Sequence, residues 1–277
     1  MKKVLVLHHD DADGFGAAFA AHNAMPDCDV TFIPVQYGQD PPELALTGNY
    51  AEVFILDFSY KREVMLTLHK VNHGALLCID HHKTAQAELE GLDFCRFNME
   101  KSGAVLAWEY FMDFLAPPIL QYVQDRDLWK FKLPYSKAVN AYIATLPNDF
   151  SVWAEFNLET ATQAGEAILA FQNEQIQRRL KEVELVSLTD PRGEDYWEPF
   201  HIPCTNASDN ISELGDAMCR AYPDAPFSMS YCDRKEGLRS YSLRSRFGFD
   251  VSEVARAFGG GGHAGAAGFT LPTPKVI

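Results

Sequence analysis

The sequence lacks the features that mark several large classes of protein. None of its six cysteines forms a C-x-x-C pair, which argues against a zinc ribbon and against a thioredoxin-like redox motif. In a chain of 277 residues, these cysteines are expected to be reduced and mostly buried. No long apolar run is present either, because Glu109, Asp113 and a Pro-Pro pair interrupt the run 104–120. The apolar run after Lys2 and Lys3 is too short for a signal peptide, so we expect a cytoplasmic protein without a membrane partner.

Positive charge is also scarce. The chain has 24 Lys and Arg against 38 Asp and Glu, a formal net charge of −14. Such a surface repels the backbone of long nucleic acid, so we expect no stable complex with it. A phosphate-containing substrate would be small or held in a local pocket. Hydrophobic residues make up 47% of the chain, which is enough for one large domain or two of ordinary size.

Short β-branched and Leu-rich runs alternate with helical patterns in the first half of the chain. Expected strands are 4–7, 30–35, 53–57 and 75–79, and expected helices are 15–25, 61–71 and 103–115. Ser102 can cap the last of these helices, and residues 117–145 are mostly helical. This alternation predicts an α/β fold with a mainly parallel sheet flanked by helices. In such sheets, ligands bind beyond the carboxyl ends of the strands.

The second half predicts a different architecture. Residues 161–188 have no Gly or Pro after Gly165 and are expected to form one long helical connector. The Pro191-Arg192-Gly193 segment marks a break. Beyond it we expect helices 211–222 and 251–258 and strands 227–232 and 238–245, which make a smaller α+β domain. The predicted domains are 1–150, a helical linker 151–190, and 191–277.

The segment His9-Asp10-Asp11-Ala12-Asp13-Gly14 follows directly after the first expected strand. Residues two apart in an extended segment share a face, so His9, Asp11 and Asp13 can point the same way. Imidazole together with carboxylates suits a divalent ion such as Mn²⁺. The alternative is an acidic turn in which Asp13 caps the following helix.

Three further segments carry similar side chains. Asp57 ends an apolar strand, and Asp80-His81-His82 ends the next one. Asp125 and Asp127 flank Arg126 near the end of a helix. The alternatives are that Asp57 caps helix 61–71 and that the Asp125–Asp127 pair is an ordinary surface ion-pair cluster. Two adjacent His beside an Asp favour a ligand and its supporting shell.

Two features of the second half suit an anion. Consecutive glycines at Gly259, Gly260, Gly261 and Gly262, followed by His263, can bring backbone N–H groups close to a phosphate, or they can form a turn after helix 251–258. On the strand 238–245, Ser240, Ser242 and Arg244 share a face, with Arg246 next along it. Arg can hold phosphate oxygens bidentately, and the alternative is a solvated strand face.

Together these motifs resemble the DHH phosphoesterase superfamily with its C-terminal DHH-associated domain. That family has an H-x-D-x-D-G segment, a strand-end Asp, Asp-His-His, a later Asp and a Gly-Gly-Gly-Gly-His signature, all present here in order. The resemblance covers residues 4 to about 271. It implies two divalent ions, Mn²⁺ first and Mg²⁺ or Co²⁺ as alternatives.

The resemblance also implies roles for individual residues. One ion would be bound by His9, Asp11 and Asp57. The other would be bound by Asp13, Asp57, His81 and Asp125, so that Asp57 bridges the two ions. Asp127 competes with Asp125 as the last of these ligands. His82 would contact the scissile phosphate or fix the site, and Asp80 would orient a histidine. Arg244, Gly260, Gly261, Gly262 and His263 would bind substrate, with the substrate expected between the two domains.

The implied activity is hydrolysis of phosphodiester or phosphomonoester bonds in short oligonucleotides or small nucleotides, by a water molecule activated between two ions. Relatives in this family include nanoRNases and RecJ-type exonucleases. Two alternatives stay open at this point: an inorganic pyrophosphate or polyphosphate hydrolase, and a nucleotide-binding module without activity. The sequence leaves the oligomeric state open.

Overall fold

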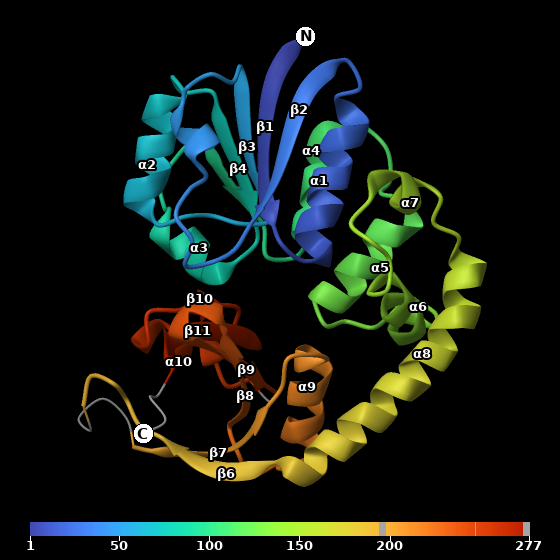
Figure 1. The fold of residues 1–277 in the computed structure, drawn as a ribbon, viewed down its shortest axis with the longest axis vertical. Coiled ribbons are helices and arrows are strands. Elements are labelled where there is room, and N and C mark those ends of the chain that lie inside the picture. Colours follow the sequence, from blue (N-terminus) through green and yellow to red (C-terminus); the bar gives the residue numbers. More distant parts are fainter. Residues whose placement is uncertain (194–197, 247, 274–277) are drawn as a thin grey trace. The chain divides into compact units, whose positions relative to one another are not determined.

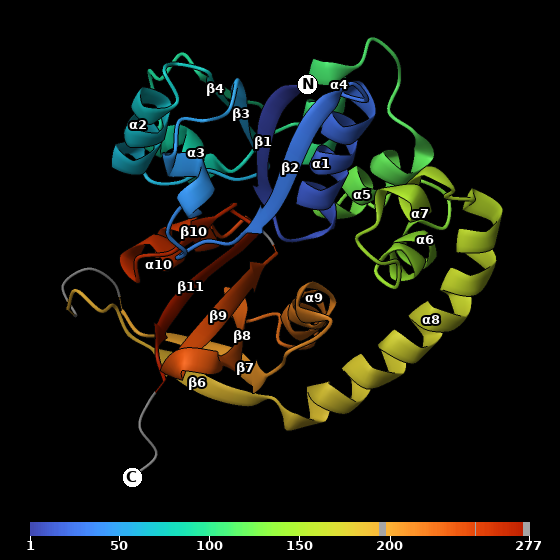
Figure 2. The ribbon, with the colours of Figure 1, turned by 45° about the horizontal axis from the view of Figure 1, so that its top comes forward.

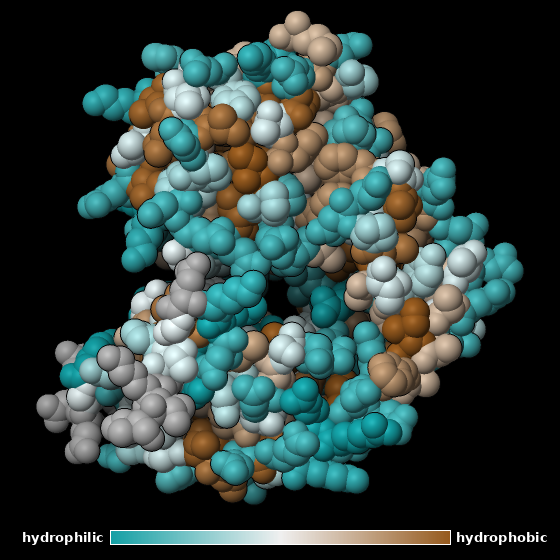
Figure 3. Space-filling view, viewed as in Figure 1, coloured by the Kyte–Doolittle hydropathy of each residue, from teal (hydrophilic) through white to brown (hydrophobic). Residues whose placement is uncertain are grey.

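The computed structural model describes residues 1–193, 198–246 and 248–273. The chain divides into two compact units, Met1–Leu169 and Ala170–Ile277. Within the described ranges, no helix combines the length and apolarity needed to cross a membrane. Hydrophilic side chains cover most of the face shown in Figure 3, with apolar residues scattered among them, as is usual for a protein surface.

The first unit is built on a parallel five-stranded sheet with the order β2-β1-β3-β4-β5. Its strands are β1 (Lys2–His9), β2 (Cys28–Val35), β3 (Glu52–Leu56), β4 (Leu76–Asp80) and β5 (Cys95–Phe97). Chain order reverses between β1 and β3, which makes their carboxyl ends the switch point at which such sheets bind ligands. The predicted parallel sheet is confirmed.

Helices cover both faces of this sheet (Figure 1). They are α1 (Ala12–Ala24), α2 (Arg62–Val71), α3 (Lys83–Glu88), α4 (Gly103–Phe111), α5 (Pro118–Asp127), α6 (Ser136–Ile143) and α7 (Phe150–Ala154), with a short 3₁₀ turn η1 (Glu43–Leu46). Val4 and Val6 of β1 face a core shared with α1, α4 and α5, whereas Leu5 and Leu7 face a core shared with α2. This alternation along one buried strand follows from the two-residue period of β structure.

The second unit is an α+β domain with a six-stranded sheet, ordered β10-β11-β9-β8-β7-β6. Its elements are η2 (Leu180–Glu182), β6 (Glu184–Leu188), β7 (Phe200–Asn206), α9 (Ile211–Ala221), β8 (Phe227–Arg234), η3 (Lys235–Gly237), β9 (Leu238–Ser245), α10 (Val251–Ala257), β10 (Gly261–Gly262) and β11 (Ala266–Pro272). Of the pairs between described strands in this sheet, only β7–β8 is parallel. Figure 2 shows β9, β8, β7 and β6 side by side with α9 along them.

The expected single helix over residues 161–188 is wrong at its C-terminal end. Helix α8 spans Leu158–Arg179, and residues 184–188 form strand β6, which pairs antiparallel with β7. Val186 and Leu188 pack against the core of the second unit, so strand pairing and burial override a composition that suits a helix. The predicted domain boundaries at residues 150 and 190 stay a prediction.

Candidate metal centre

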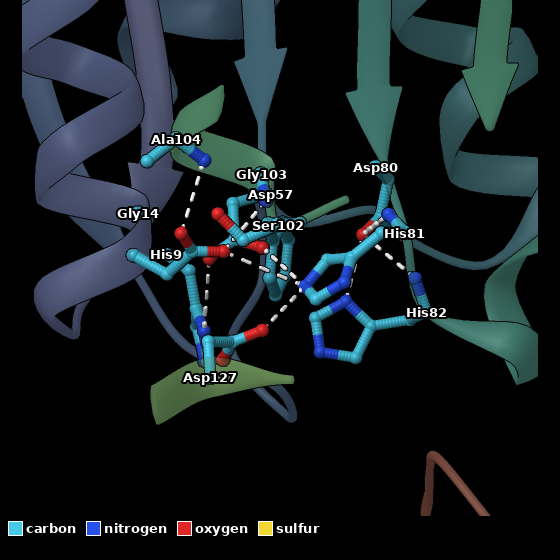
Figure 4. A network of polar contacts seen from close by, with 12 residues as sticks. His9, Gly14, Asp57, Asp80, His81, His82, Ser102, Gly103, Ala104 and Asp127 are labelled. Carbon is cyan, nitrogen blue, oxygen red and sulfur yellow. Dashed lines mark hydrogen bonds and ion pairs between the residues drawn. The ribbon is translucent and has the colours of Figure 1, made fainter. Parts of the chain in front are cut away.

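The strand-end residues of the first unit gather at the carboxyl edge of its sheet. His9 ends β1, Asp57 follows β3, and His81 follows β4. Figure 4 shows these side chains directed toward one another, with Asp127 from the end of α5 opposite them. Because β1 and β3 flank the switch point, the topology itself brings residues 48 positions apart to one place.

One group of possible ligands consists of His9, Asp11 and Asp57, whose ligand atoms all lie within 4.8 Å of one another. His9 Nδ1 lies 3.0 Å from Asp11 Oδ2 and 3.8 Å from Asp57 Oδ2. Asp11 also caps α1, because its Oδ1 accepts a hydrogen bond from Gly14 N at 2.9 Å. The cap is therefore Asp11 rather than Asp13, and capping leaves the second oxygen of Asp11 facing His9.

A second group consists of Asp13, His81 and Asp127. His81 Nε2 lies 3.5 Å from an oxygen of Asp13 and 3.5 Å from an oxygen of Asp127. The Asp13 carboxylate is held at the N-terminus of α4 by Gly103 N (2.6 Å) and Ala104 N (3.1 Å). Two N–H groups at the start of the helix therefore fix the orientation of the Asp13 carboxylate.

Asp57 lies between the two groups. Its Oδ2 faces His9, and its Oδ1 lies 3.1 Å from His81 Nε2. Asp57 does not cap α2, because the N-cap residue of that helix is Lys61 and no side chain caps it. The Asp57 backbone is left-handed (φ 56°). Such a conformation costs about 1–3 kcal/mol for a residue other than glycine and persists where the surroundings enforce it. One carboxylate oxygen facing each group is the placement that a bridging ligand requires.

Gly103, which the sequence did not single out, makes room for Asp57. A Cβ on Gly103 would lie 2.3 Å from Asp57 Cβ and 2.5 Å from Asp57 Oδ1. Glycine is a poor helix former, and here it occupies the first position of α4, directly after the capping Ser102. A glycine at such a position is the signal that could have identified it.

The electrostatics of the cluster suit bound cations. Burial raises the pKa of Asp57, and the neighbouring carboxylates of Asp13 and Asp11 raise it further. The pKa of Asp127 is also raised, mainly by burial and then by the same two carboxylates. Among the described residues, the buried Asp57 Oδ1 accepts no hydrogen bond of good geometry. Divalent ions would relieve this repulsion, and carboxylate oxygens with imidazole nitrogens are a suitable donor set.

Asp80 and His82 form a pair behind the cluster. The fully buried Asp80 Oδ1 accepts hydrogen bonds from His81 N (2.7 Å) and His82 N (3.2 Å), and lies 2.7 Å from His82 Nδ1. Burial acts to lower the pKa of His82, but the charge and hydrogen bond of Asp80 outweigh it and raise the pKa to about 9. Asp80 therefore orients His82 and favours its charged form.

The expectation that Asp125 reaches into the cluster is wrong in its placement. The Asp125 carboxylate is buried, and its two oxygens accept hydrogen bonds from Lys132 N (2.9 Å) and Leu133 N (3.0 Å). Asp127 occupies the place in the cluster that was expected for Asp125. Helix residues two apart do not share a face, so only one of the two carboxylates can point at the cluster.

In the second unit, the glycine run is largely structural. Gly259 N donates to Arg256 O (3.0 Å) and Gly260 N to Ala255 O (2.8 Å), so these two groups cap α10. Gly261 and Gly262 form β10, paired with Gly268 and Ala267. The expected anion-binding run is therefore wrong for Gly259 and Gly260, whose N–H groups the helix already uses.

Gly260 and Gly262 also allow two backbones to approach closely. A Cβ on Gly260 would lie 2.0 Å from Gly268 O, and one on Gly262 would lie 2.6 Å from Ala266 O. His263 begins a tight turn, in which its N–H donates to Ala266 O at 2.8 Å. Substrate binding by Gly261, Gly262 and His263 stays a prediction.

Arg244 is held beneath α9. Its Nη2 donates to Ser212 Oγ (2.8 Å) and its Nη1 to Leu243 O (2.8 Å). Gly215 leaves space for this side chain, because a Cβ there would lie 2.5 Å from Arg244 Cγ. The arginine is thus preorganised, and its role in binding substrate stays a prediction. Arg246 instead forms an ion pair with Asp216 (3.2 Å).

Comparison with known proteins places the chain in a family. The model of the DHHA1 domain matches residues 227–277. An uncharacterised protein, R106 of Acanthamoeba polyphaga mimivirus, is 30% identical over 301 residues, covering 99% of this chain and 70% of that protein. The oligoribonuclease NrnB of Bacillus subtilis is 25% identical over 302 residues, covering 95% of this chain and 71% of that protein.

Solved structures show the same fold. The DHH domain of a protein from a family of ribosomal proteins matches with a TM-score of 0.55 and 15% identity, covering 98% of this chain and 83% of the other. RecJ from Thermus thermophilus, in complex with Mn²⁺, matches with a TM-score of 0.50 and 14% identity, covering 98% of this chain and 49% of that one. The chain belongs to the DHH superfamily of phosphoesterases that carry a DHHA1 domain. As a member of this family, the protein is a hydrolase. It has groups of acidic and histidine residues that could hold metal.

Proposed function

We propose that this protein is a Mn²⁺-dependent phosphoesterase that hydrolyses phosphodiester or phosphomonoester bonds in short oligonucleotides or small nucleotides. One observation carries the proposal: two groups of three ligand-bearing side chains meet at Asp57, at the switch point of a parallel sheet. This arrangement supports two adjacent ions, one held by His9, Asp11 and Asp57 and the other by Asp13, Asp57, His81 and Asp127.

When bound, two such ions polarise water and stabilise both the attacking and leaving oxygens of a phosphoryl group. The remaining roles belong to the protein. Asp80 holds His82 through a 2.7 Å contact, and a charged His82 can donate a hydrogen bond to a phosphate oxygen. Asp13 keeps its orientation through two backbone N–H groups of α4. A rigid ligand set of this kind supplies positioning before substrate arrives.

The choice of a nucleotide substrate is supported by the oligoribonuclease among the relatives and by the DHHA1 domain. The net charge of −14 favours a short substrate over long nucleic acid. In the second unit, the preorganised Arg244 supports a grip on a phosphate.

The test is a product analysis with Mn²⁺ and a panel of pAp, dinucleotides, short RNA, short DNA and pyrophosphate. We expect cleavage of the nucleotide substrates, loss of cleavage in excess chelator after verified metal removal, and loss in Asp127→Asn. Asp113→Asn, which changes an exposed carboxylate after α4, is the matched control and should retain activity.

Each competing function has its own outcome in this experiment. Cleavage of pyrophosphate alone would indicate an inorganic phosphohydrolase. Nucleotide binding without cleavage by the fully metallated protein would indicate a binding module. Full activity in the metal-free protein would rule out the two-ion proposal.

A further inference from the structure

The segment between α5 and α6, residues 128–135, has an unusual backbone. Trp129, Phe131 and Tyr135 all adopt left-handed conformations, with φ of 54°, 46° and 55°. Left-handed backbone is disfavoured for side chains of this size, because Cβ crowds the following carbonyl. We call residues 128–135 the aromatic loop.

Asp125 enforces this conformation. Its backbone oxygen accepts hydrogen bonds from Lys130 N (2.8 Å) and Phe131 N (3.2 Å), and its carboxylate accepts those of Lys132 and Leu133. The Tyr122 hydroxyl donates to Pro134 O at 2.9 Å. The buried carboxylate of Asp125 thus holds the loop in a strained conformation. This strain costs stability, and a simple connection between two helices does not require it.

The loop presents aromatic rings to solvent. Trp129 is 37% exposed and Tyr135 is 64% exposed. The rings of Trp129 and Phe131 meet edge to face, with centroids 4.9 Å apart, and Lys137 Nζ lies 5.1 Å from the Phe131 centroid. Large rings are normally buried, so three of them within seven residues, two of them exposed, indicate a ligand-binding surface.

The loop is also locally basic in an acidic protein. Residues 126–137 contain four basic side chains, Arg126, Lys130, Lys132 and Lys137, and a single acidic one, Asp127. Over the whole chain, acidic residues outnumber basic ones by 38 to 24. Alternating rings and cations suit a ligand with flat apolar faces joined by negative charges.

The loop begins beside the metal centre. Trp129 comes two residues after Asp127, one of the clustered carboxylates. Consecutive Cα atoms are about 3.8 Å apart, so the two Cα atoms are separated by at most about 7.6 Å. The backbone at the start of the loop is therefore close to that of Asp127.

We propose that the aromatic loop is a stacking platform for unpaired nucleobases of a single-stranded oligonucleotide whose phosphate lies at the metal centre. This proposal rests on the proposed function and narrows its substrate class to oligonucleotides. Stacking on Trp129 and Phe131 tolerates any base, because every base has a flat π face. The exposed Lys132 can offset the charge of a neighbouring phosphate.

The test pairs a change in the protein with a change in the ligand. Trp129→Gly removes the ring, while glycine adopts a positive φ without strain, so folding should be retained. The ligands are fluorescein-labelled single-stranded pentanucleotides, as RNA and as DNA, each with an abasic analogue of the same length and charge. Binding is measured by fluorescence anisotropy in chelator, and KM and kcat are measured with Mn²⁺.

We expect wild type to bind the base-bearing strands about tenfold more tightly than the abasic ones, in line with stacking of a single base. In Trp129→Gly this ratio should fall markedly toward one, through weaker binding of the base-bearing strands and a higher KM, with metal content unchanged. Trp129→Phe should restore much of the preference. Tyr110→Ala, which removes an exposed ring at the far end of α4, should behave like wild type.

The stacking proposal is overturned if wild type has no preference for bases, if Trp129→Gly keeps the wild-type ratio, or if Tyr110→Ala loses it as well. Failure of the proposed function looks different. In that case the Mn²⁺-loaded wild type cleaves no nucleotide at all, while the anisotropy measurement still decides whether the loop recognises bases.

Discussion

Two carboxylates that lie two positions apart in the same segment should respond to mutation in opposite ways. Asp127 contributes to the metal cluster, whereas Asp125 holds the backbone of the aromatic loop. Asp127→Asn removes a charge from a crowded group of carboxylates, so it should leave the melting temperature unchanged or raise it slightly. The same change should abolish binding of one ion and reduce kcat/KM by at least about a hundredfold, a loss on the order of 3 kcal/mol in transition-state stabilisation.

Asp125→Ala should instead act on stability. Hydrogen bonds to a charged group contribute about 1.5–3 kcal/mol each, and the Asp125 carboxylate accepts two of them from backbone N–H groups. Because Lys132 is exposed, water can replace part of this loss, and we expect a net cost of about 2–4 kcal/mol. For a unit of this size that corresponds to a fall in melting temperature of roughly 4–16 °C.

Differential scanning calorimetry and elemental analysis of both variants separate the two roles. Asp125→Ala should still bind two ions below its melting temperature. The reasoning is refuted if Asp125→Ala loses metal without loss of stability, or if Asp127→Asn keeps both ions and full activity.

Three further variants test the rest of the site. Asparagine tolerates a left-handed backbone, so Asp57→Asn should fold but lose both ions or nearly both by elemental analysis. Retention of two tightly bound ions would contradict a bridging role. Asp80→Asn should retain the ions but lower kcat about 10–100-fold through a misoriented His82, and a drop in metal content alone would argue for Asp80 as a ligand. Arg244→Ala should retain the ions and lower kcat/KM for nucleotides roughly 10–150-fold, with a smaller effect on bis(p-nitrophenyl) phosphate; an equal loss on both substrates would argue against a substrate-binding role.

The parts of the site that could be predicted from sequence are those that topology determines. His9, Asp57 and His81 each end or follow an apolar strand, and the carboxyl ends of parallel strands share one edge of the sheet. Given the alternation of strands and helices, their proximity follows without knowledge of any side-chain contact. The helix cap at Ser102 is predictable for a similar reason, because capping depends on residues within one turn.

The errors lie where a distant segment decides between local alternatives. Asp125 and Asp127 are equivalent in local sequence, and the choice depends on backbone N–H groups seven and eight residues downstream of Asp125. Residues 184–188 have a composition that a helix would accept, but β7 supplies a strand partner that begins 12 residues after β6 ends. Gly259 and Gly260 fit an anion-binding run until α10 is seen to use their N–H groups.

The close packing of Gly103 against Asp57 is a long-range constraint of this kind, and it leads to a prediction. It is 46 residues from Asp57 in sequence, yet a methyl group at this position would lie 2.3 Å from Asp57 Cβ, where ordinary contacts begin near 3.4 Å. In Gly103→Ala the start of α4 must therefore move, and with it the N–H groups that hold Asp13. Overpacking costs about 1–3 kcal/mol, while the gain in helix propensity returns up to about 1 kcal/mol, so the protein should fold with a modest loss of stability.

Because Asp57 faces both groups of ligands and Asp13 belongs to one of them, Gly103→Ala should weaken the binding of both ions together, by at least about tenfold, as measured by metal titration. Ser102→Ala is the matched control, since it removes the cap of the same helix at a cost of about 1 kcal/mol without placing any atom near Asp57. If Ser102→Ala weakens metal binding as much as Gly103→Ala does, the effect comes from the stability of α4. If Gly103→Ala binds metal like wild type, the close packing against Asp57 does not position the bridging carboxylate.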